Sequence, residues 1–125
     1  METRHFFNLY DMSQGIARTL AEGLEAKVFP GDNLMLSVVR IAANCSGESH
    51  SHPQEQWGVL LEGSGVRLQD GIEHEISAGD FWQMPGGVSH GFRAGPDGAL
   101  VLDIFSPPRD EYRRPGTGFA AGEGS

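Results

Sequence analysis

The chain has 125 residues, a formal net charge of −8, 18 glycines, seven prolines and a single cysteine. This length is typical of one domain that buries its own core, and the acidic balance argues against nucleic acid or an anionic membrane as the main partner, since both bind through concentrated lysine and arginine. Cys45 excludes a disulfide within the chain, and residues 2–5 do not begin the apolar core of a signal peptide, so we expect a cytoplasmic protein with a small-molecule partner.

Short runs that are typical of strands follow one another along the chain, each bounded by turn residues. Residues 24–29 and 34–43 flank the turn Pro-Gly-Asp-Asn, which predicts a hairpin. Further runs are at 56–62, 66–69, 72–76, 81–84, 89–93 and 99–105. Many short strands joined by tight turns predict an all-β fold, either a sandwich or a double-sheet jelly-roll barrel.

The two ends of the chain are less regular. Residues 13–23 fit either a short helix or an edge strand. The glycine-rich tail from Arg113 has little to bury, which predicts that it is mobile unless a partner orders it. We therefore expect an N-terminal segment at 1–24, a barrel at 25–106, and a C-terminal segment at 107–125 that is partly mobile.

Three histidines form the first candidate site. His50 and His52 are two residues apart, so on an extended chain both imidazoles point to the same face. Two histidines in a loop are also compatible with solvated side chains. Gln56 follows four residues later, and His90 comes after a Pro-Gly-Gly turn that begins another strand. Three histidines near strand starts can converge in a barrel, which is the geometry of a metal site.

This spacing resembles the two motifs of the cupins, G(X)5HXH(X)3,4E(X)6G and G(X)5PXG(X)2H(X)3N. The matched positions are Asn44, His50, His52, Gln56 and Gly63 in the first motif, and Gly79, Pro85, Gly87, His90 and Ala94 in the second. Asn44 replaces a glycine and tolerates a positive φ angle nearly as well. The resemblance implies a cupin barrel, or double-stranded β-helix, in which His50, His52, Gln56 and His90 hold one divalent metal ion, such as Zn, Ni, Fe or Mn.

The ligand at position 56 decides the charge of the site. Glu55 is the alternative to Gln56, because a slip of one residue in the strand exchanges the two. A carboxylate ligand supports higher oxidation states of iron, whereas a neutral amide leaves the metal's full charge available for Lewis-acid chemistry. Gln56 therefore favours a reaction without redox change.

A second candidate site lies near the end of the chain. The run at 99–105 is apolar on both faces except for Asp103, and a buried carboxylate needs a nearby cation or keeps its proton. Such a group is a candidate acid or base, although an edge-strand aspartate facing water is the alternative. Arg109 follows two prolines, and its planar fork suits a substrate carboxylate unless it is a solvated loop residue.

The stretches HSHPQEQWGVLLEG and DIFSPPRDEY together resemble the KdgF group of pectin- and alginate-degradation cupins. This resemblance implies that the chain converts 4,5-unsaturated monouronates, the products of polysaccharide lyases, into linear ketonised sugars. Asp103 would then move the proton, Arg109 would bind the uronate carboxylate, and Phe105 would pack against the sugar ring. Because cupins commonly pair, we also expect a homodimer.

Two other classes of function are compatible with the same residues. One is a metal-dependent cupin dioxygenase or a polyketide-cyclase-like enzyme. The other is a non-enzymatic module that binds a small molecule, since one fold hosts many functions.

Overall fold

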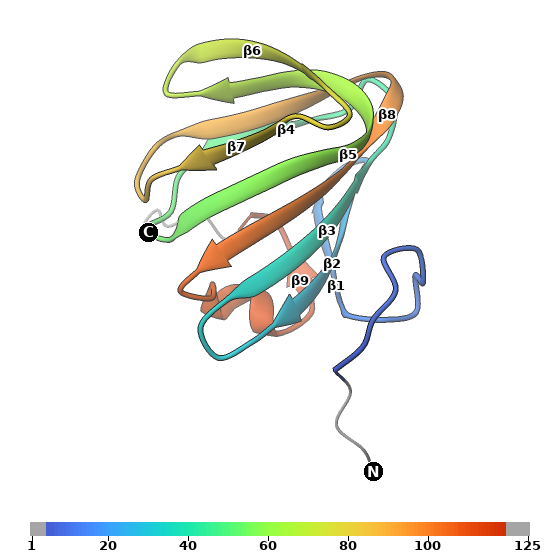
Figure 1. The fold of residues 1–125 in the computed structure, drawn as a ribbon, viewed down its shortest axis with the longest axis vertical. Helices are drawn as coiled ribbons and strands as arrows, with labels where there is room; N and C mark the ends of the chain where they lie inside the picture. The colour runs from blue at the N-terminus through green and yellow to red at the C-terminus, as the bar shows by residue number, and fades with distance from the viewer. Residues whose placement is uncertain (1–4, 120–125) are drawn as a thin grey trace.

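The computed structural model describes residues 5–119, and strands make up most of this range (Figure 1). They are β1 (Ile16–Ala21), β2 (Leu24–Pro30), β3 (Met35–Ile41), β4 (Ser46–His50), β5 (Glu55–Gln69), β6 (Ile72–Ser77), β7 (Phe81–Met84), β8 (His90–Ser106) and β9 (Gly116–Thr117), with one 3-10 turn, η1 (Asp110–Arg113). The predicted all-β fold is confirmed. Within the described range, we find no helix with the length and apolar character that crossing a membrane requires.

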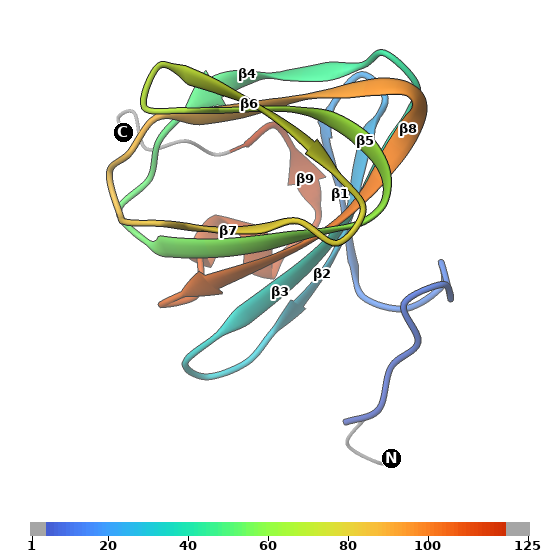
Figure 2. The same ribbon diagram turned by 45° about the horizontal axis from the view of Figure 1, so that its top comes forward.

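Two long strands organise the barrel. The sheet order is β6-β5-β8-β3-β2-β1-β9, with β4 also paired to β8 and β7 also paired to β5. β5 and β8 run antiparallel, and two register shifts near Gly63 bend them so that the strands curve around a common interior (Figure 2). Gly63 has φ 89°, and a Cβ there would lie 2.0 Å from the Gly98 carbonyl oxygen. The bend therefore requires glycine.

The interior of the barrel is filled from strands that alternate buried and exposed residues. In β2, Leu24, Ala26 and Val28 point inward while Glu25 is exposed. The buried core comprises Leu20, Leu24, Ala26, Val28, Met35, Val39, Ile41, Leu60, Ala94, Val101, Phe105 and Tyr112. Each large apolar side chain in it contributes about 1.5–3 kcal/mol by burial.

The N-terminal segment joins this architecture. Of the two alternatives for residues 13–23, the structure contains a strand, β1, which pairs antiparallel with β2. The residues before it run along the outside of the barrel, where Phe7 lies 4.8 Å from Phe29 between ring centroids. Arg40 also donates a hydrogen bond to the Leu9 carbonyl at 2.9 Å. The predicted hairpin is present as β2 and β3, which pair from Leu24 to Pro30.

The C-terminal segment packs against the barrel as far as it is described. β9 pairs in parallel with β1, and the Arg18 guanidinium donates hydrogen bonds to the carbonyls of Glu111, Thr117 and Gly118 at 2.8 to 3.0 Å. These contacts differ from the expectation that the tail buries little, because one buried arginine satisfies one backbone acceptor of η1 and two in the glycine-rich stretch at β9. Residues 120–125 of the predicted mobile tail lie outside the described residues.

Replacing Arg18 tests how much this attachment contributes to stability. Arg18→Met keeps most of the side-chain volume but leaves three carbonyls without their donor, so the free energy of unfolding should fall by about 1–3 kcal/mol. Urea unfolding followed by circular dichroism measures this change. The exposed Arg93 on β8 provides the matched control, since Arg93→Met should leave the midpoint nearly unchanged. Equal midpoints for both variants would contradict the role of Arg18.

Candidate functional site

The three histidines meet because strand pairing aligns two strand ends. β4 ends at His50 and β8 begins at His90, and these two residues are paired across the strands. Their ring centroids lie 4.4 Å apart, and those of His52 and His90 lie 4.9 Å apart. One nitrogen atom of each of the three rings lies within 4.8 Å of the others. The three histidines therefore form a candidate metal centre.

The Pro-Gly-Gly turn positions His52 and His90. The Gly87 amide donates a hydrogen bond to the His52 carbonyl at 2.8 Å, which brings this turn against the chain between β4 and β5. A Cβ on Gly86 would lie 2.0 Å from the Pro53 carbonyl oxygen. Only glycine permits so close an approach, so the second motif holds the two histidine segments together through its backbone.

Backbone carbonyls orient all three imidazoles. The Nδ1 atoms of His50, His52 and His90 lie 3.0, 3.1 and 3.0 Å from the carbonyl oxygens of Glu48, Gln54 and Val88. With a proton on Nδ1, each Nε2 lone pair faces the interior, which is how proteins commonly orient histidine ligands. The Nε2 atom of His90 is buried and has no hydrogen-bond partner. A metal ion at this point would give that atom a partner.

The contact between His52 and Gln56 also fits a cation. Burial, assisted by the charge of Arg109, lowers the pKa of His52 to about 4, so the ring is neutral near pH 7. A neutral ring has one N–H, yet its nitrogens face two oxygens, Gln54 O at 3.1 Å and Gln56 Oε1 at 2.9 Å. If the Gln56 amide were turned over, its NH2 group would face His52, but its oxygen would then face the oxygen of the Asp103 carboxylate. A cation shared by His52 Nε2 and Gln56 Oε1 removes it.

Gln56 and Glu55 point in opposite directions, as neighbours in a strand do. Gln56 is 3% exposed and donates from Nε2 to Asp103 Oδ1 at 3.0 Å. Glu55 is exposed and accepts hydrogen bonds from Trp57 Nε1 at 2.8 Å and from Gln83 Nε2 at 3.3 Å. The side chain beside the histidines is therefore the amide and not the carboxylate.

A cavity of about 60 Å³ lies next to the histidines inside the barrel. Its wall contains apolar side chains of the core together with His50, Gln56 and His90. Four charged residues also border it, namely Glu48, Arg67, Asp103 and Arg109, of which only Glu48 is exposed. The charges that are shielded from solvent are thus two buried guanidiniums and one partly buried carboxylate, which favours an anionic ligand.

The three residues expected to act on substrate line this cavity from the end of β8 and the segment after it. Burial raises the pKa of Asp103 to about 6, against the opposing effects of Arg67, Gln56 and Arg109. Phe105 is buried, and its ring lies 5.5 Å from that of His52. Arg109 is 1% exposed, so the alternative of a solvated loop residue is excluded.

The guanidinium of Arg109 is packed against aromatic rings and the C-terminal segment and does not face open solvent. Its group lies 4.2 Å from the centroid of the Tyr112 ring and 5.4 Å from that of Phe105. It also donates a hydrogen bond to the Phe119 carbonyl. Arg109 therefore joins the cavity wall to the C-terminal segment.

Sequence reasoning did not select Arg67, Tyr112 or Phe119, although all three line the cavity. Phe119 stacks on His50 with 4.2 Å between ring centroids, and Tyr112 is 2% exposed. Both lie in the C-terminal segment, residues 107–125, whose composition carries no signal of burial. Arg67 is 5% exposed and sits in the run 66–69, where the alternation of apolar Val66 and Leu68 with polar residues reads as an ordinary half-buried strand.

Comparison with known proteins agrees with this geometry. A family model described as a cupin domain matches residues 37–105. The solved structure of KdgF from Halomonas sp. superposes with a TM-score of 0.76 and 27% identity, covering 87% of this chain and 98% of that one. The pectin degradation protein KdgF of Dickeya dadantii is 26% identical over 95 residues, which are 74% of this chain and 86% of its own length.

A further relative is named for a different activity. The dimethylsulfoniopropionate lyase DddW of Ruegeria pomeroyi is 38% identical over 81 residues, or 65% of this chain. The match covers 51% of that relative, so the chain spans about half of its length. Since the family model matches more than half of the chain and its range includes His50, His52 and His90, the chain belongs to the cupin family.

Proposed function

We propose that this cupin is a metal-dependent enzyme that converts 4,5-unsaturated monouronates into linear ketonised sugars without redox change. The observation that carries the proposal is the neutral Gln56 beside three histidines, hydrogen-bonded at 3.0 Å to a partly buried aspartate. The two KdgF relatives support the substrate class. A homodimer and a cytoplasmic location remain predictions from the sequence.

His50, His52, His90 and Gln56 are the residues that would hold the metal. A divalent ion bound there supplies Lewis acidity toward a substrate oxygen. Burial lowers the pKa of all three histidines, so their rings stay neutral and keep a lone pair for coordination near pH 7. The amide contributes an oxygen without adding negative charge.

The remaining cavity residues act on the substrate directly in this proposal. The linear product forms when the bond between C1 and the ring oxygen breaks and the C1 hydroxyl loses its proton, so that C1 becomes an aldehyde. The oxygen that stays on C5 is then an enol, which becomes a ketone as C4 gains a proton. Asp103 is the candidate for this proton transfer because its carboxylate borders the cavity and is oriented by Gln56. Phe105 would pack against the sugar. Either of two guanidiniums is able to pair with the carboxylate: Arg109, which the resemblance favours, and Arg67.

A lyase reaction on dimethylsulfoniopropionate is the second candidate, favoured by the 38% identity to DddW. That substrate carries a sulfonium cation as well as a carboxylate. The cation would have to enter a cavity whose buried charges are two guanidiniums and one carboxylate, which is electrostatically less favourable than binding a uronate anion. Incubation with each compound distinguishes the two activities, through release of a volatile sulfide or loss of the ultraviolet absorbance of the unsaturated uronate.

The metal assignment predicts a loss of bound metal when one imidazole is removed. His90→Ala should reduce the metal content of the purified protein from about one ion per chain to a small fraction. The backbone carbonyls that orient the imidazoles cannot replace a missing ligand. Elemental analysis after dialysis measures it. His74→Ala, at an exposed position on β6, is the control and should retain its metal. Full metal content in a folded His90→Ala protein would show that the site is elsewhere.

Gln56→Glu tests the importance of a neutral ligand. The variant should still bind metal, since glutamate is an acceptable oxygen ligand, but its added negative charge should reduce Lewis acidity and slow turnover of the unsaturated uronate. Metal content and steady-state kinetics are measured on the same preparation. Unchanged turnover by the metal-loaded variant would mean that the neutrality of Gln56 has no part in the reaction.

Asp103→Asn separates proton transfer from structural support. Asparagine keeps the shape of the side chain but does not exchange a proton near neutral pH, so kcat should fall by about 10²–10⁴-fold with little change in KM. Asp32→Asn, in the exposed loop between β2 and β3, is the control. A thermal melt is run beside the kinetics. Near-wild-type kcat in folded Asp103→Asn would remove Asp103 from the mechanism, and the absence of turnover by the wild-type protein would refute the uronate activity itself.

A further inference from the structure

Arg67 is a buried cation whose hydrogen-bond acceptors in the barrel are weak. Its Nη2 donates to the Met84 sulfur at 3.4 Å, and its Nε lies 3.5 Å from Gln69 Oε1, at the limit of a hydrogen bond. The guanidinium lies 5.1 Å from the centroid of the Trp82 ring. Within residues 5–119 we find no carboxylate in ion-pair contact with it. A guanidinium has five N–H donors, so most of its hydrogen-bonding capacity is not used by these neighbours.

Trp82 adds a second donor to the same place. Its Nε1 is buried and has no hydrogen-bond partner. The register explains how it comes to line the cavity: Gly58 on β5 is paired with Trp82 on β7 and with Asp103 on β8. A Cβ on Gly58 would lie 2.5 Å from Trp82 Nε1, so the indole occupies the space that a side chain at position 58 would fill.

The weak acceptors of Arg67 and the missing acceptor of Trp82 Nε1 both point to a ligand. A buried cation with no carboxylate in ion-pair contact loses solvation that its protein neighbours restore only in part, and a buried N–H without an acceptor carries a further penalty. Burial lowers the pKa of Arg67 and the nearby Asp103 carboxylate raises it, while an arginine remains charged near pH 7. Both donors border the cavity that also contains His50, His90 and Asp103.

The other guanidinium of the cavity is already engaged. Arg109 packs against Tyr112 and Phe105 and donates to the Phe119 carbonyl. To bind a carboxylate through two N–H groups at once, Arg109 would have to rearrange its contact with the C-terminal segment. Arg67 requires no such change, because its present acceptors are a thioether sulfur and a distant amide oxygen.

We propose that Arg67, assisted by the Nε1–H of Trp82, binds the carboxylate of the substrate. This assignment rests on the proposed function for the identity of the substrate, a uronate, but its physical content is a site for a small carboxylate anion beside the histidine cluster. Arg109 then has a positioning role, in which it connects the cavity wall to Phe119. In this arrangement, the ring and hydroxyl oxygens of the substrate lie toward the histidines, and its carboxylate lies toward β5 and β7.

The test compares a saturated uronate with its uncharged counterpart. D-galacturonate, which has no double bond to react, and D-galactose are titrated into the purified protein, with the metal that it carries, by isothermal titration calorimetry. Arg67→Met should bind galacturonate at least about 10-fold more weakly, as expected for loss of a charge-assisted hydrogen bond. Its affinity for galactose should not change. Trp82→Phe should weaken galacturonate binding by a smaller factor, and Arg67→Lys should restore it only in part, because lysine lacks the planar fork.

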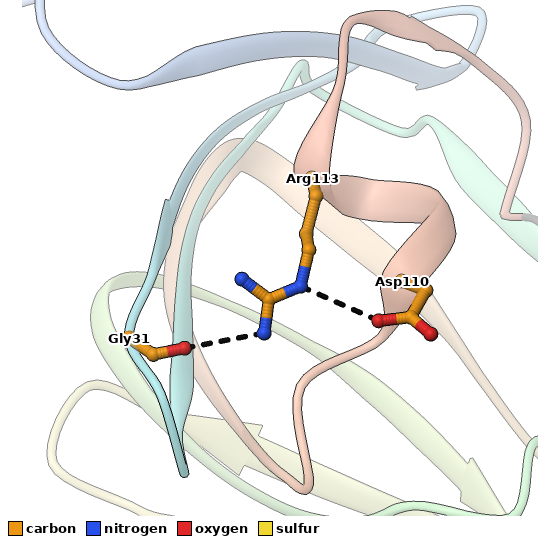
Figure 3. Close-up of polar contacts among 3 residues, drawn as sticks. All are labelled: Gly31, Asp110 and Arg113. Atoms are coloured by element: carbon orange, nitrogen blue, oxygen red, sulfur yellow. Dashed lines mark hydrogen bonds and ion pairs between the residues drawn. The ribbon is translucent and has the colours of Figure 1, made fainter.

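Arg113 provides a matched arginine control. It lies on η1 outside the cavity, where it contacts Asp110 Oδ1 at 3.3 Å and donates to the Gly31 carbonyl at 3.3 Å (Figure 3). Arg113→Met should bind galacturonate as the wild-type protein does. A thermal melt of each variant checks that the protein is folded at the temperature of the titration, so that a loss of galacturonate binding is not a loss of the fold.

The outcomes separate this assignment from the proposed function. Equal galacturonate affinity of the wild-type and Arg67→Met proteins, or no binding by the wild type, would overturn the role of Arg67. A loss of binding in Arg109→Lys but not in Arg67→Met would overturn it in favour of Arg109. If the wild-type protein binds galacturonate through Arg67 but does not turn over the unsaturated uronate, the anion site stands and the proposed reaction fails.

Discussion

The geometry of the site depends on three hydrogen bonds from imidazole Nδ1 atoms to backbone carbonyls. They turn the Nε2 lone pairs of His50, His52 and His90 toward one point, where one nitrogen of each ring lies within 4.8 Å of the others. Neutral lone pairs that face one another in a buried place are unfavourable unless a cation lies between them. The arrangement is therefore unfavourable without a cation, and a metal ion bound there would also stabilise the fold.

Two bent strands bring the other functional groups to that point. β5 carries Gln56 and Arg67, and β8 carries His90, Asp103 and Phe105. Because side chains alternate along a strand, residues separated by an even number share the inner face on each side of a bend. The bend at Gly63 lets one strand supply residues to both halves of the barrel. One long pair of strands thus forms much of the cavity wall. A shift of one residue in their register would turn these side chains away from the cavity.

The C-terminal segment completes the wall through contacts with the barrel. Arg18 binds three of its carbonyls, and Phe119 stacks on His50 and covers Gly47, whose missing side chain leaves room for the aromatic ring. These interactions explain how a glycine-rich sequence with few apolar residues packs closely. The balance of charge within the wall, two buried guanidiniums against one partly buried carboxylate, favours an anion electrostatically.

Local patterns in the sequence determined the all-β class, the hairpin of β2 and β3, and the spacing of the histidines, because each depends on neighbours within a few residues. Asn44 shows how far such reasoning reaches: it replaces a motif glycine and has the positive φ angle, 61°, that its side chain tolerates. The choice between Glu55 and Gln56 was open, since a shift of one residue exchanges the faces of a strand, and only pairing with β7 and β8 decided it. The burial of Arg67 and the packing of Phe119 also required the tertiary structure. Nothing near Arg67 in the chain distinguishes an arginine that lines a cavity from one on a solvated face, and the neighbours that distinguish them, Trp82 and Asp103, come from strands elsewhere in the sequence.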